Sequence, residues 1–258
     1  MKTFFLSLLL AASHSIAFAQ GGVQTIPLNG AKAFHLSADM SGVVINIGGN
    51  DEIKVHHFLT VDGKDRPDLR ELNIDRSGST LSLEELKPNN QTLEKERGYG
   101  NLNVRHRPGP YKGEQHGGTQ VVSYLEVTVP ADVTLTAESL YGSIDVKGVK
   151  DMPRAKSRYG SITIVFAPDA KIASIDYESD YQSIDLTLPG SITANVDLDT
   201  KYGSLYTDFD ISIKANTSNG RRRPEPFSDG QLRGTINGGG ERISLHSEYK
   251  NIYLRKMK

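Results

Sequence analysis

The histidines of this chain are its first candidates for chemistry, as metal ligands. His56 and His57 are adjacent, so on a strand their side chains face opposite sides and cannot both bind one ion. His106 and His116 lie ten residues apart in a loop that also contains Glu114. A site that joins a strand histidine to this loop pair is one alternative, but the spacing is weak for a metal site. The spacing favours exposed histidines, and we expect no metal and no cofactor.

Carboxylates recur through the second half of the chain and suggest a second kind of chemistry. They are Asp145, Asp176, Asp185, Asp197 and Asp208. Some β-solenoid enzymes cut acidic polysaccharides with such side chains, so a polysaccharide lyase or hydrolase is an alternative function. The aspartates alternate with apolar residues, however, which is typical of the solvated face of a strand. No acid, base and positioning group come together, and the sequence therefore favours a protein that is not an enzyme.

Two further sets of residues suit binding. Arg221, Arg222 and Arg223 could grip a phosphate, a lipid headgroup or an acidic glycan, or could simply belong to a soluble loop flanked by prolines. The second set consists of Tyr141, Tyr159, Tyr181, Tyr202 and Tyr249. A row of tyrosines can contact sugar rings or a protein, or can seal the corner between strands as a purely architectural ladder. These two sets are the candidate contact surface.

The glycine-rich stretch Gly238-Gly239-Gly240 is more typical of a turn than of a binding loop. A phosphate-binding loop needs a following Lys-Ser or Lys-Thr and a helix, and neither is present in the sequence pattern. The series of nonapeptide repeats that binds calcium is also absent. We therefore assign no ligand to these glycines.

Each of the five tyrosines belongs to a copy of one short pattern. The copies read Ser139-Leu-Tyr141-Gly-Ser-Ile144, Ser157-Arg-Tyr159-Gly-Ser-Ile162, Ser179-Asp-Tyr181-Gln-Ser-Ile184, Thr200-Lys-Tyr202-Gly-Ser-Leu205 and Ser247-Glu-Tyr249-Lys-Asn-Ile252. The tyrosines are 18, 22, 21 and 47 residues apart, and an interruption over residues 218–230 explains the doubled final gap. A period of about 20 residues is typical of one unit stacked on itself.

Apolar residues after each tyrosine take every second position, as Ile162, Ile164 and Phe166 do. This period of two predicts a strand with one buried face, and each interval holds a second, weaker strand, such as residues 172–177 and 192–198. The sequence therefore predicts an all-β fold, a β-solenoid or β-helix-like stack of coils with a period of about 20 residues. Stacking predicts two ladders in chain order, one of the tyrosines and one of the residues Ile144, Ile162, Ile184, Leu205 and Ile252.

The first half of the chain contributes further strands. Residues 33–37, 42–49 and 52–56 are expected to form strands that begin the stack, and a hairpin is expected around Ser77-Gly78. Residues 87–119 contain three prolines and six glycines and form an irregular insertion, after which residues 121–129 form a strand. The polar residues 255–258 are expected to cap one end of the stack.

Residues 1–19 have the features of a secretory signal peptide. Lys2 supplies the positive start, residues 4–12 are mostly apolar, and Ala17-Phe18-Ala19 is a cleavage motif. Residues 20–258 would then form one domain, exported by the Sec pathway to the periplasm, the cell surface or the medium. The chain has no cysteine, which excludes disulfides, a lipidated cysteine and thiol catalysis. We expect no transmembrane segment in the mature chain, and a net charge of −1 gives no sign of nucleic-acid binding.

The chain resembles the bacterial putative-adhesin family. The resemblance rests on Ile45-Asn-Ile47-Gly-Gly, on Leu125-Glu-Val127-Thr-Val129-Pro130, on the repeated Gly-Ser-Ile units and on the ending from Ile236 to Leu245. It implies an extracytoplasmic β-strand-repeat protein of unknown function, with no catalytic residues to carry over. The expected function is a non-enzymatic binding or adhesion module of the cell envelope, with a glycan or an envelope protein as partner. An envelope signalling or scaffold protein is the alternative.

Overall fold

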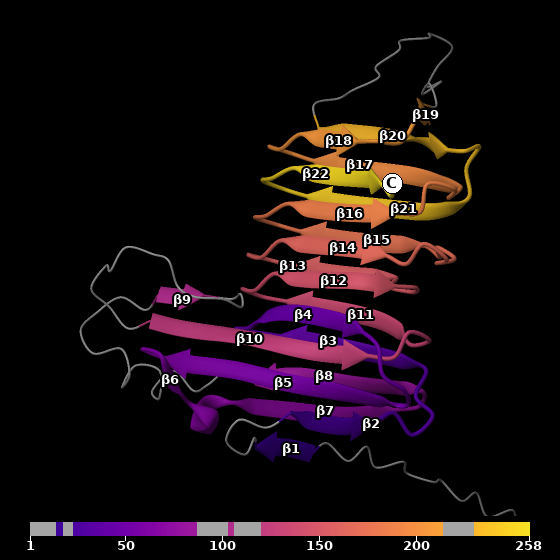
Figure 1. The fold of residues 1–258 in the computed structure, drawn as a ribbon. Helices are drawn as coiled ribbons and strands as arrows, with labels where there is room; N and C mark the ends of the chain where they lie inside the picture. Colours follow the sequence, from indigo (N-terminus) through magenta and orange to yellow (C-terminus); the bar gives the residue numbers. More distant parts are fainter. Residues whose placement is uncertain (1–13, 18–22, 87–102, 106–119, 214–229) are drawn as a thin grey trace, which may run out of the picture.

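The computed structural model describes residues 14–17, 23–86, 103–105, 120–213 and 230–258. Strands dominate these residues, and the one helical element among them is a single 3-10 turn, η1 (Pro67–Leu69). The predicted all-β class is confirmed. The strands form two large mixed sheets, which are not closed into a barrel (Figure 1).

The first sheet contains strands from both ends of the chain. In spatial order they are β1 (His14–Ala17), β7 (Glu71–Ser77), β8 (Thr80–Leu86), β3 (Ala33–Ala38), β11 (Thr134–Ser139), β13 (Arg154–Ser157), β15 (Ile175–Ser179), β21 (Glu241–Ser247), β17 (Ala194–Thr200), β20 (Gln231–Ile236) and β19 (Ile211–Ile213). The hairpin predicted around Ser77-Gly78 is confirmed, because β7 and β8 pair antiparallel.

The second sheet lies against the first. Its main path runs through β18 (Leu205–Thr207), β22 (Ile252–Lys256), β16 (Ile184–Leu188), β14 (Ile162–Phe166), β12 (Ile144–Val149), β4 (Gly42–Ile47), β10 (Gln120–Val129), β5 (Glu52–Val61) and β2 (Gln24–Pro27). Two short strands lie off this path: β6 (Lys64–Asp65) pairs with β5, and β9 (Asn103–Arg105) pairs with β10. Within the predicted insertion over residues 87–119, β9 is the part that the structure describes.

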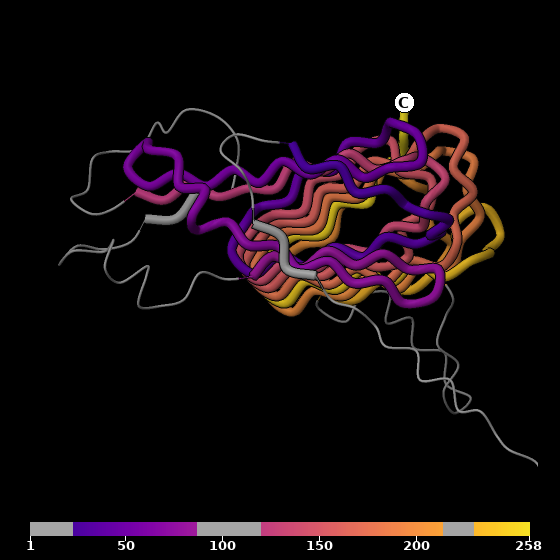
Figure 2. The backbone as a smooth tube through the Cα atoms, turned by 90° about the horizontal axis from the view of Figure 1, so that it is seen from below, coloured from indigo at the N-terminus to yellow at the C-terminus, as the bar shows by residue number. Residues whose placement is uncertain are grey.

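From β11 to β18 the chain passes alternately between the two sheets, so that one strand of each sheet makes a coil. Neighbouring coils pair parallel and in register in both sheets, as β13 does on β11 and β14 does on β12. β3 and β4 form a coil of the same kind below β11 and β12, which confirms that the opening strands belong to the stack. Figure 2 shows the coils lying behind one another, with the N-terminal strands extending beyond them on one side.

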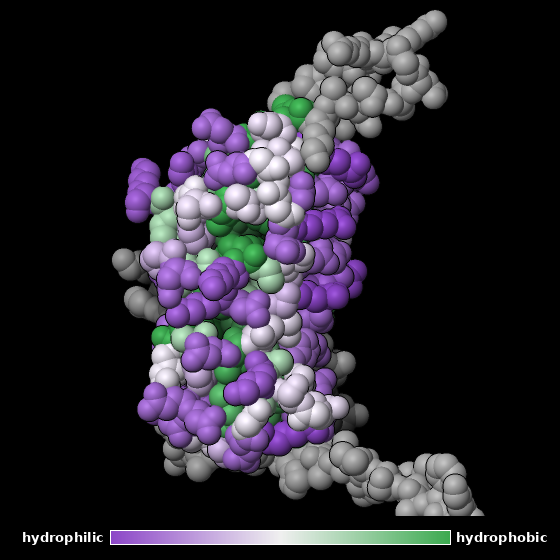
Figure 3. Space-filling view, turned by 90° about the vertical axis from the view of Figure 1, so that its right-hand side faces the viewer, coloured by the Kyte–Doolittle hydropathy of each residue, from purple (hydrophilic) through white to green (hydrophobic). Residues whose placement is uncertain are grey.

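The core lies between the two sheets and follows from the alternation of apolar and polar residues. In the second sheet, one row consists of the buried residues Val43, Ile144, Ile162, Ile184 and Ile252 and the partly buried Leu205. Facing it, Tyr177 is fully buried and donates its hydroxyl to the carbonyl of Met152 at 2.8 Å. Ala137 and Ala155, its neighbours on the same row, leave room for this large side chain. The side of the molecule drawn in Figure 3 exposes hydrophobic residues only as a narrow strip between polar ones.

The order of the coils differs from the order predicted from the sequence. β21 pairs with both β15 and β17, and β22 pairs with both β16 and β18. The coil made by β21 and β22, here called the intercalated coil, therefore lies between two coils that precede it in the chain. Predicting the ladders in chain order was wrong, because nothing in a repeated motif fixes which copies become neighbours.

The ends of the stack also differ from the prediction. β22 contains Arg255 and Lys256 and lies inside the second sheet, so residues 255–258 do not cap an end. In the first sheet, β20 and β19 add to β17 in antiparallel pairs at one end, and β7 adds antiparallel to β8 at the other. The outermost strands of the two sheets, β1, β19, β18 and β2, are three or four residues long, and very short edge strands are one way in which natural sheets limit further pairing.

A row of buried hydroxyls joins the coils at the turn between the two sheets. Ser157 donates to the carbonyl of Gly142 at 3.1 Å and accepts the N–H of Gly160 at 3.0 Å. Ser179 repeats the pattern by donating to the carbonyl of Gly160 at 3.2 Å. This hydroxyl ladder, which consists of Ser139, Ser157, Ser179, Ser247 and Thr200, sits two residues before each repeated tyrosine.

The glycine after the tyrosine is needed because neighbouring turns approach closely. A Cβ atom added to Gly160 would overlap the backbone of Gly142, and one added to Gly142 would overlap the backbone of Ser41 and Gly42. Neither glycine has a positive φ, so the requirement is for space rather than for a left-handed backbone.

We predict that Gly160→Ala destabilises the protein by about 1–3 kcal/mol, because the new methyl group meets backbone that cannot move aside. Gly48→Ala is the matched control, since the nearest atom to its added Cβ, Thr128 Cγ2, lies 3.9 Å away. Urea unfolding monitored by circular dichroism measures both free energies of unfolding. Equal stabilities for the two variants would show that close approach is not the reason for glycine at this turn.

Candidate functional site

The repeated tyrosines form one continuous row at the turn where the chain passes from the first sheet to the second. The row, here called the tyrosine ridge, runs in the spatial order Tyr141, Tyr159, Tyr181, Tyr249 and Tyr202. Successive ring centroids are 5.2, 4.9, 4.9 and 5.2 Å apart, and the planes are inclined by 9°, 11°, 3° and 22°. The predicted tyrosine ladder is confirmed, with Tyr249 inserted between Tyr181 and Tyr202.

Each ridge tyrosine is partly exposed, from 38% for Tyr181 to 62% for Tyr202. The rings stack nearly parallel, so each interior ring turns its faces toward neighbouring tyrosines. The part that reaches solvent is therefore the ring edge together with the hydroxyl group. A sugar ring cannot stack face to face on an interior tyrosine, and a partner must bind these edges and hydroxyls.

A column of mainly charged residues lies directly beside the ridge, because each of its members precedes a tyrosine. Arg158 faces Asp180 at 3.8 Å, and Lys201 faces Glu248 at 3.4 Å. The Arg158 guanidinium also lies 5.4 Å from the ring centroid of Tyr159. Contacts with the Tyr202 side chain and Glu248 raise the pKa of Lys201, so this amine stays charged at neutral pH. These charges are paired with one another, and the column has no strong excess of either sign.

A column of uncharged residues lies on the other side of the ridge. Ser161 donates its hydroxyl to that of Ser143 at 3.1 Å, and Asn251 Oδ1 accepts the backbone N–H of Ser204 at 2.9 Å. Ser183 lies on the rung between Ser161 and Asn251. Ser143 is buried, and the other members of this column add neutral hydrogen-bonding groups to the tyrosine hydroxyls at the surface.

A groove of about 300 Å³ lies beside one end of the ridge. Its lining includes Glu138 and Lys156 from the first sheet, and Arg158 and Asp180 from the turns. Lys156 Nζ donates to Glu178 at 2.8 Å, so the charges around the groove are largely satisfied within the protein. The groove therefore extends the ridge surface but is not a closed binding cavity.

A second aromatic pair lies on the outer face of the second sheet. Tyr206 and Tyr253, from β18 and β22, stack with centroids 5.0 Å apart. Arg255 lies 4.9 Å from the Tyr253 ring centroid and donates to both carboxylate oxygens of Asp185, at 2.7 and 2.9 Å. This pair is separate from the ridge and matches it in residue type.

The aspartates weighed as polysaccharide-cleaving residues face outward, as the alternation predicts. Asp145, Thr163 and Asp185 share one row of the second sheet, whereas Asp176 and Asp197 lie on the first sheet. In the described parts of the chain, no cluster of three or more histidines, aspartates or glutamates is placed to hold a metal ion. The aspartates are thus distributed over two faces rather than gathered into one site.

A buried cluster that sequence reasoning missed joins Ser41, His57, Glu85 and Ser123. Ser41 Oγ lies 2.5 Å from Glu85 Oε1, 3.4 Å from His57 Nε2 and 2.5 Å from Ser123 Oγ. His57 Nε2 also faces Glu85 Oε1 at 3.2 Å, and both side chains are 1% exposed. The prediction of exposed histidines was wrong for His57, because its neighbours are three polar residues that are distant in the sequence.

This cluster resembles a serine–histidine–carboxylate triad in composition but not in arrangement. A triad histidine contacts the serine with one ring nitrogen and the carboxylate with the other, whereas here Nε2 faces both. The serine is also fully buried, so no substrate reaches it.

Glu85 instead caps the hydroxyl ladder. It lies on the same row as Ala38 and Ser139, and its Oε2 accepts the N–H groups of Met40 and Ser41 at 2.9 and 2.8 Å. Burial raises the pKa of Glu85, but the contacts with His57 and Ser41 outweigh it and hold the pKa below its ordinary value. The carboxylate is therefore ionised at neutral pH, and it accepts the backbone N–H groups that the last turn of the stack would otherwise leave without a hydrogen bond.

Several predicted residues lie outside the described residues. They are Arg221, Arg222, Arg223, His106, His116 and Glu114. Of the candidate contact surface, the structure thus brings the five tyrosines together and describes none of the three arginines. Within the described residues, no helix is long and apolar enough to cross a membrane.

We predict that Glu85→Gln destabilises the protein at pH 7 by about 1.5–3 kcal/mol, the usual worth of hydrogen bonds to a charged group. A lowered pKa in the folded state gives stability that is complete above the unfolded-state pKa, near 4.3, and is lost as the pH falls through the folded-state value. The difference between Glu85→Gln and the native protein should therefore shrink below about pH 4.

Urea unfolding at pH 7 and at pH 3 tests this prediction. Glu84→Gln is the control, because Glu84 is adjacent and exposed. A difference that stays constant between the two pH values would contradict an ionised Glu85 as the cap of the ladder.

Comparison with known proteins adds a likeness of fold. No family model matches the chain, and no curated protein matches its sequence. A crystal structure of a putative cell adhesion protein from Clostridium sporogenes is similar, with a TM-score of 0.58 and 10% sequence identity, over 96% of this chain and 100% of that chain. At this identity the likeness concerns the fold alone.

A crystal structure of a putative adhesin from Bacteroides fragilis was also found, at 8% identity over 97% of this chain and 98% of that chain. Its TM-score of 0.23 is too low to carry an argument. The resemblance to putative adhesins, expected from the sequence, is confirmed at the level of the fold by the Clostridium sporogenes structure, which bears that kind of name.

Proposed function

We propose that this protein is a non-enzymatic binding module of the adhesion type, and that the tyrosine ridge is its contact surface. The observation that supports this most is the unbroken row of five partly exposed tyrosines on one edge of the stack. Tyrosine is enriched among the residues that carry binding energy, because it joins a large apolar ring to a polar tip. The charged residues beside the ridge already pair with one another, so the tyrosine hydroxyls and the neutral residues are the groups that would bind a partner.

The mode of contact follows from the stacking. Because the ring faces are turned toward one another, the partner lies along the ridge and meets hydroxyls and ring edges at a spacing close to 5 Å. The partly exposed Ser161 and Ser183 and the exposed Ser204 widen this strip on one side. A partner with repeated hydrogen-bonding groups, either a glycan chain or an extended segment of an envelope protein, fits such a strip.

We further propose that residues 20–258 form a single two-sheet β-solenoid domain and that the chain is exported by the Sec pathway. Cleavage after Ala19 would remove β1 (His14–Ala17) from its place beside β7 at the edge of the first sheet. The in-register parallel pairing of successive coils supports the solenoid. The signal-like residues 1–19 support export. N-terminal sequencing of the exported protein should begin at Gln20. A protein that keeps its first 19 residues in the cell would contradict this part of the proposal.

The ridge is tested with two sets of substitutions at its three central tyrosines. Tyr159→Phe, Tyr181→Phe and Tyr249→Phe keep the ring stack and remove the hydroxyls. Combined, they should weaken binding by about tenfold or more, because each lost hydrogen bond costs about 0.5–1.5 kcal/mol. The same three positions changed to Ser should abolish binding.

Glycan arrays and pull-downs from envelope fractions give the readout, with saturable binding measured for any partner found. The control is Tyr206→Phe with Tyr253→Phe, which removes two hydroxyls from the separate aromatic pair. A partner that binds the ridge variants and the control equally well would overturn the ridge as contact surface. Loss of binding only when Arg221, Arg222 and Arg223 are changed to Ser would move the contact to that segment instead. Turnover of an acidic polysaccharide that is lost on changing Asp145 and Asp185 to Asn would contradict a non-enzymatic function.

A further inference from the structure

The intercalated coil is held on both sides by coils that come earlier in the chain. On one side, the N–H groups of Glu248 and Tyr249 donate to the carbonyls of Ser179 and Asp180 at 3.2 and 3.1 Å. On the other side, the N–H group of Tyr202 donates to the carbonyl of Glu248 at 3.0 Å. The coils β15/β16 and β17/β18 therefore form the two walls of a slot that the intercalated coil fills.

The charges of the walls explain why β15 and β17 are not neighbours. Asp176 and Asp197 lie on one row, separated by Ser244, and Glu178 and Asp199 lie on the next, separated by His246. Direct stacking in chain order would place Asp176 opposite Asp197 and Glu178 opposite Asp199. Like charges directly opposite on neighbouring strands are destabilising. Direct pairing of β15 with β17 is therefore destabilised by charge repulsion, whereas a strand with neutral or basic residues at these positions can lie between them.

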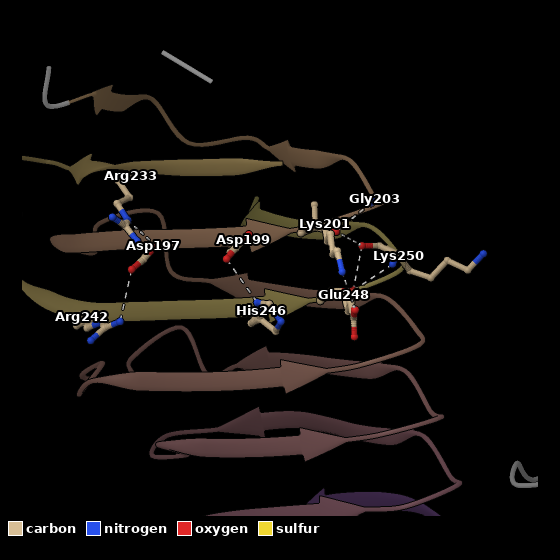
Figure 4. A network of polar contacts seen from close by, with 11 residues as sticks. Asp197, Asp199, Lys201, Gly203, Arg233, Arg242, His246, Glu248 and Lys250 are labelled. Carbon is tan, nitrogen blue, oxygen red and sulfur yellow. Dashed lines mark hydrogen bonds and ion pairs between the residues drawn. The ribbon is translucent and has the colours of Figure 1, made fainter. Parts of the chain in front are cut away.

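The intercalated coil supplies these residues. Arg242 faces Asp197 at 3.4 Å, and His246 faces Asp199 at 3.7 Å (Figure 4). At the turn, Glu248 faces Lys201 at 3.4 Å. Ser247 completes the hydroxyl ladder, since it donates to the carbonyl of Gln182 at 3.0 Å. Both charge and hydrogen bonding therefore identify this coil as the one that belongs in the slot.

The connection to the coil is a short loop that also bonds to residues at the start of β17. Asn237 Nδ2 donates to the carbonyl of Ile192 at 2.7 Å, and the Asn195 side chain donates to the carbonyl of Gly240. Residues 237–240 read Asn-Gly-Gly-Gly and join β20 to β21 around the start of β17. Asn237, Gly238 and Gly239 all have positive φ, at 48°, 87° and 94°, which makes a tight reversal. A loop with three glycines also adopts other conformations at low cost, and such a loop can serve as a hinge.

We propose that the slot also accepts the intercalated coil of a second copy of this chain, so that two copies exchange the coil reciprocally. Every contact that selects the coil joins groups of the slot to groups of the coil, and these contacts are the same whichever copy supplies the coil. Exchange of an identical element is a low-cost route to a dimer. This inference is independent of the tyrosine ridge as a contact surface.

The test uses two full-length variants with matched charge reversals. Asp197 also faces Arg233 of β20 at 3.0 Å, so this arginine is reversed together with it. The slot variant carries Asp197→Lys, Asp199→Lys and Arg233→Glu, and the coil variant carries Arg242→Glu and His246→Glu. In each variant alone, the coil and the slot repel each other. In a dimer of one slot variant with one coil variant, both exchanged coils meet a slot of opposite charge.

The two variants are unfolded, mixed and refolded together at high protein concentration, then analysed by size-exclusion chromatography and native mass spectrometry. We expect one-to-one heterodimers in at least about tenfold excess over either homodimer, because three exposed ion pairs and the contact of His246 with Asp199 are restored at once. A refolded mixture that contains only monomers would overturn the proposal. So would dimers that form equally well from either variant alone.

A third chain controls for folding, because it carries all five substitutions and matches slot and coil within one molecule. It should fold with a stability close to that of the native protein, as judged by thermal unfolding. If none of the three variants folds, the experiment uses the native protein instead, with one sample at natural isotope composition and one labelled with heavy isotopes. Refolded together at high concentration, these chains should give dimers that contain one copy of each mass, and their complete absence would overturn the proposal.

Discussion

The hydroxyl ladder at the turns is the interaction on which the rest of this structure depends. Each buried Ser or Thr binds the turn of its own coil and the turn of its neighbour, so it fixes both the shape of the turn and the register between coils. Because side chains alternate along a strand, a slip of one residue would exchange the buried and exposed faces of every following strand. Ser157 and its equivalents thus place the isoleucines inside and the tyrosines at the edge.

The ladder also explains the buried charge at one end of the stack. The coil of β3 and β4 has Ala38 where later coils have a serine, and no further repeat lies below it. Its turn would leave N–H groups unsatisfied in the interior, which is costly. Glu85 accepts those of Met40 and Ser41, and Ser41, Ser123 and His57 surround the carboxylate. A set of residues that suggests catalysis by its composition has a structural role here.

The charges on the coils agree with the observed order of the coils, and that order sets the composition of the ridge. The backbone ladders and the apolar rows accept any copy of the repeat, since all copies have the same pattern. The acidic residues of β15 and β17 set these two strands apart and select β21, with Arg242 and His246, as the strand between them. As a result Tyr249, distant in the sequence, stacks on both Tyr181 and Tyr202 and keeps the ridge continuous.

The sequence by itself determined the all-β class, the strands after each tyrosine and the existence of a tyrosine row. These features depend on local patterns, namely the period of two and the spacing of one short motif. The tertiary structure alone decided the position of the intercalated coil, the cap at Glu85 and the covering of the tyrosine faces. Each of these depends on contacts such as Asp197 with Arg242 or Glu85 with Ser41, which join residues more than 40 positions apart. A repeat specifies what its copies look like, but long-range charge pairing and the satisfaction of buried polar groups specify which copies become neighbours.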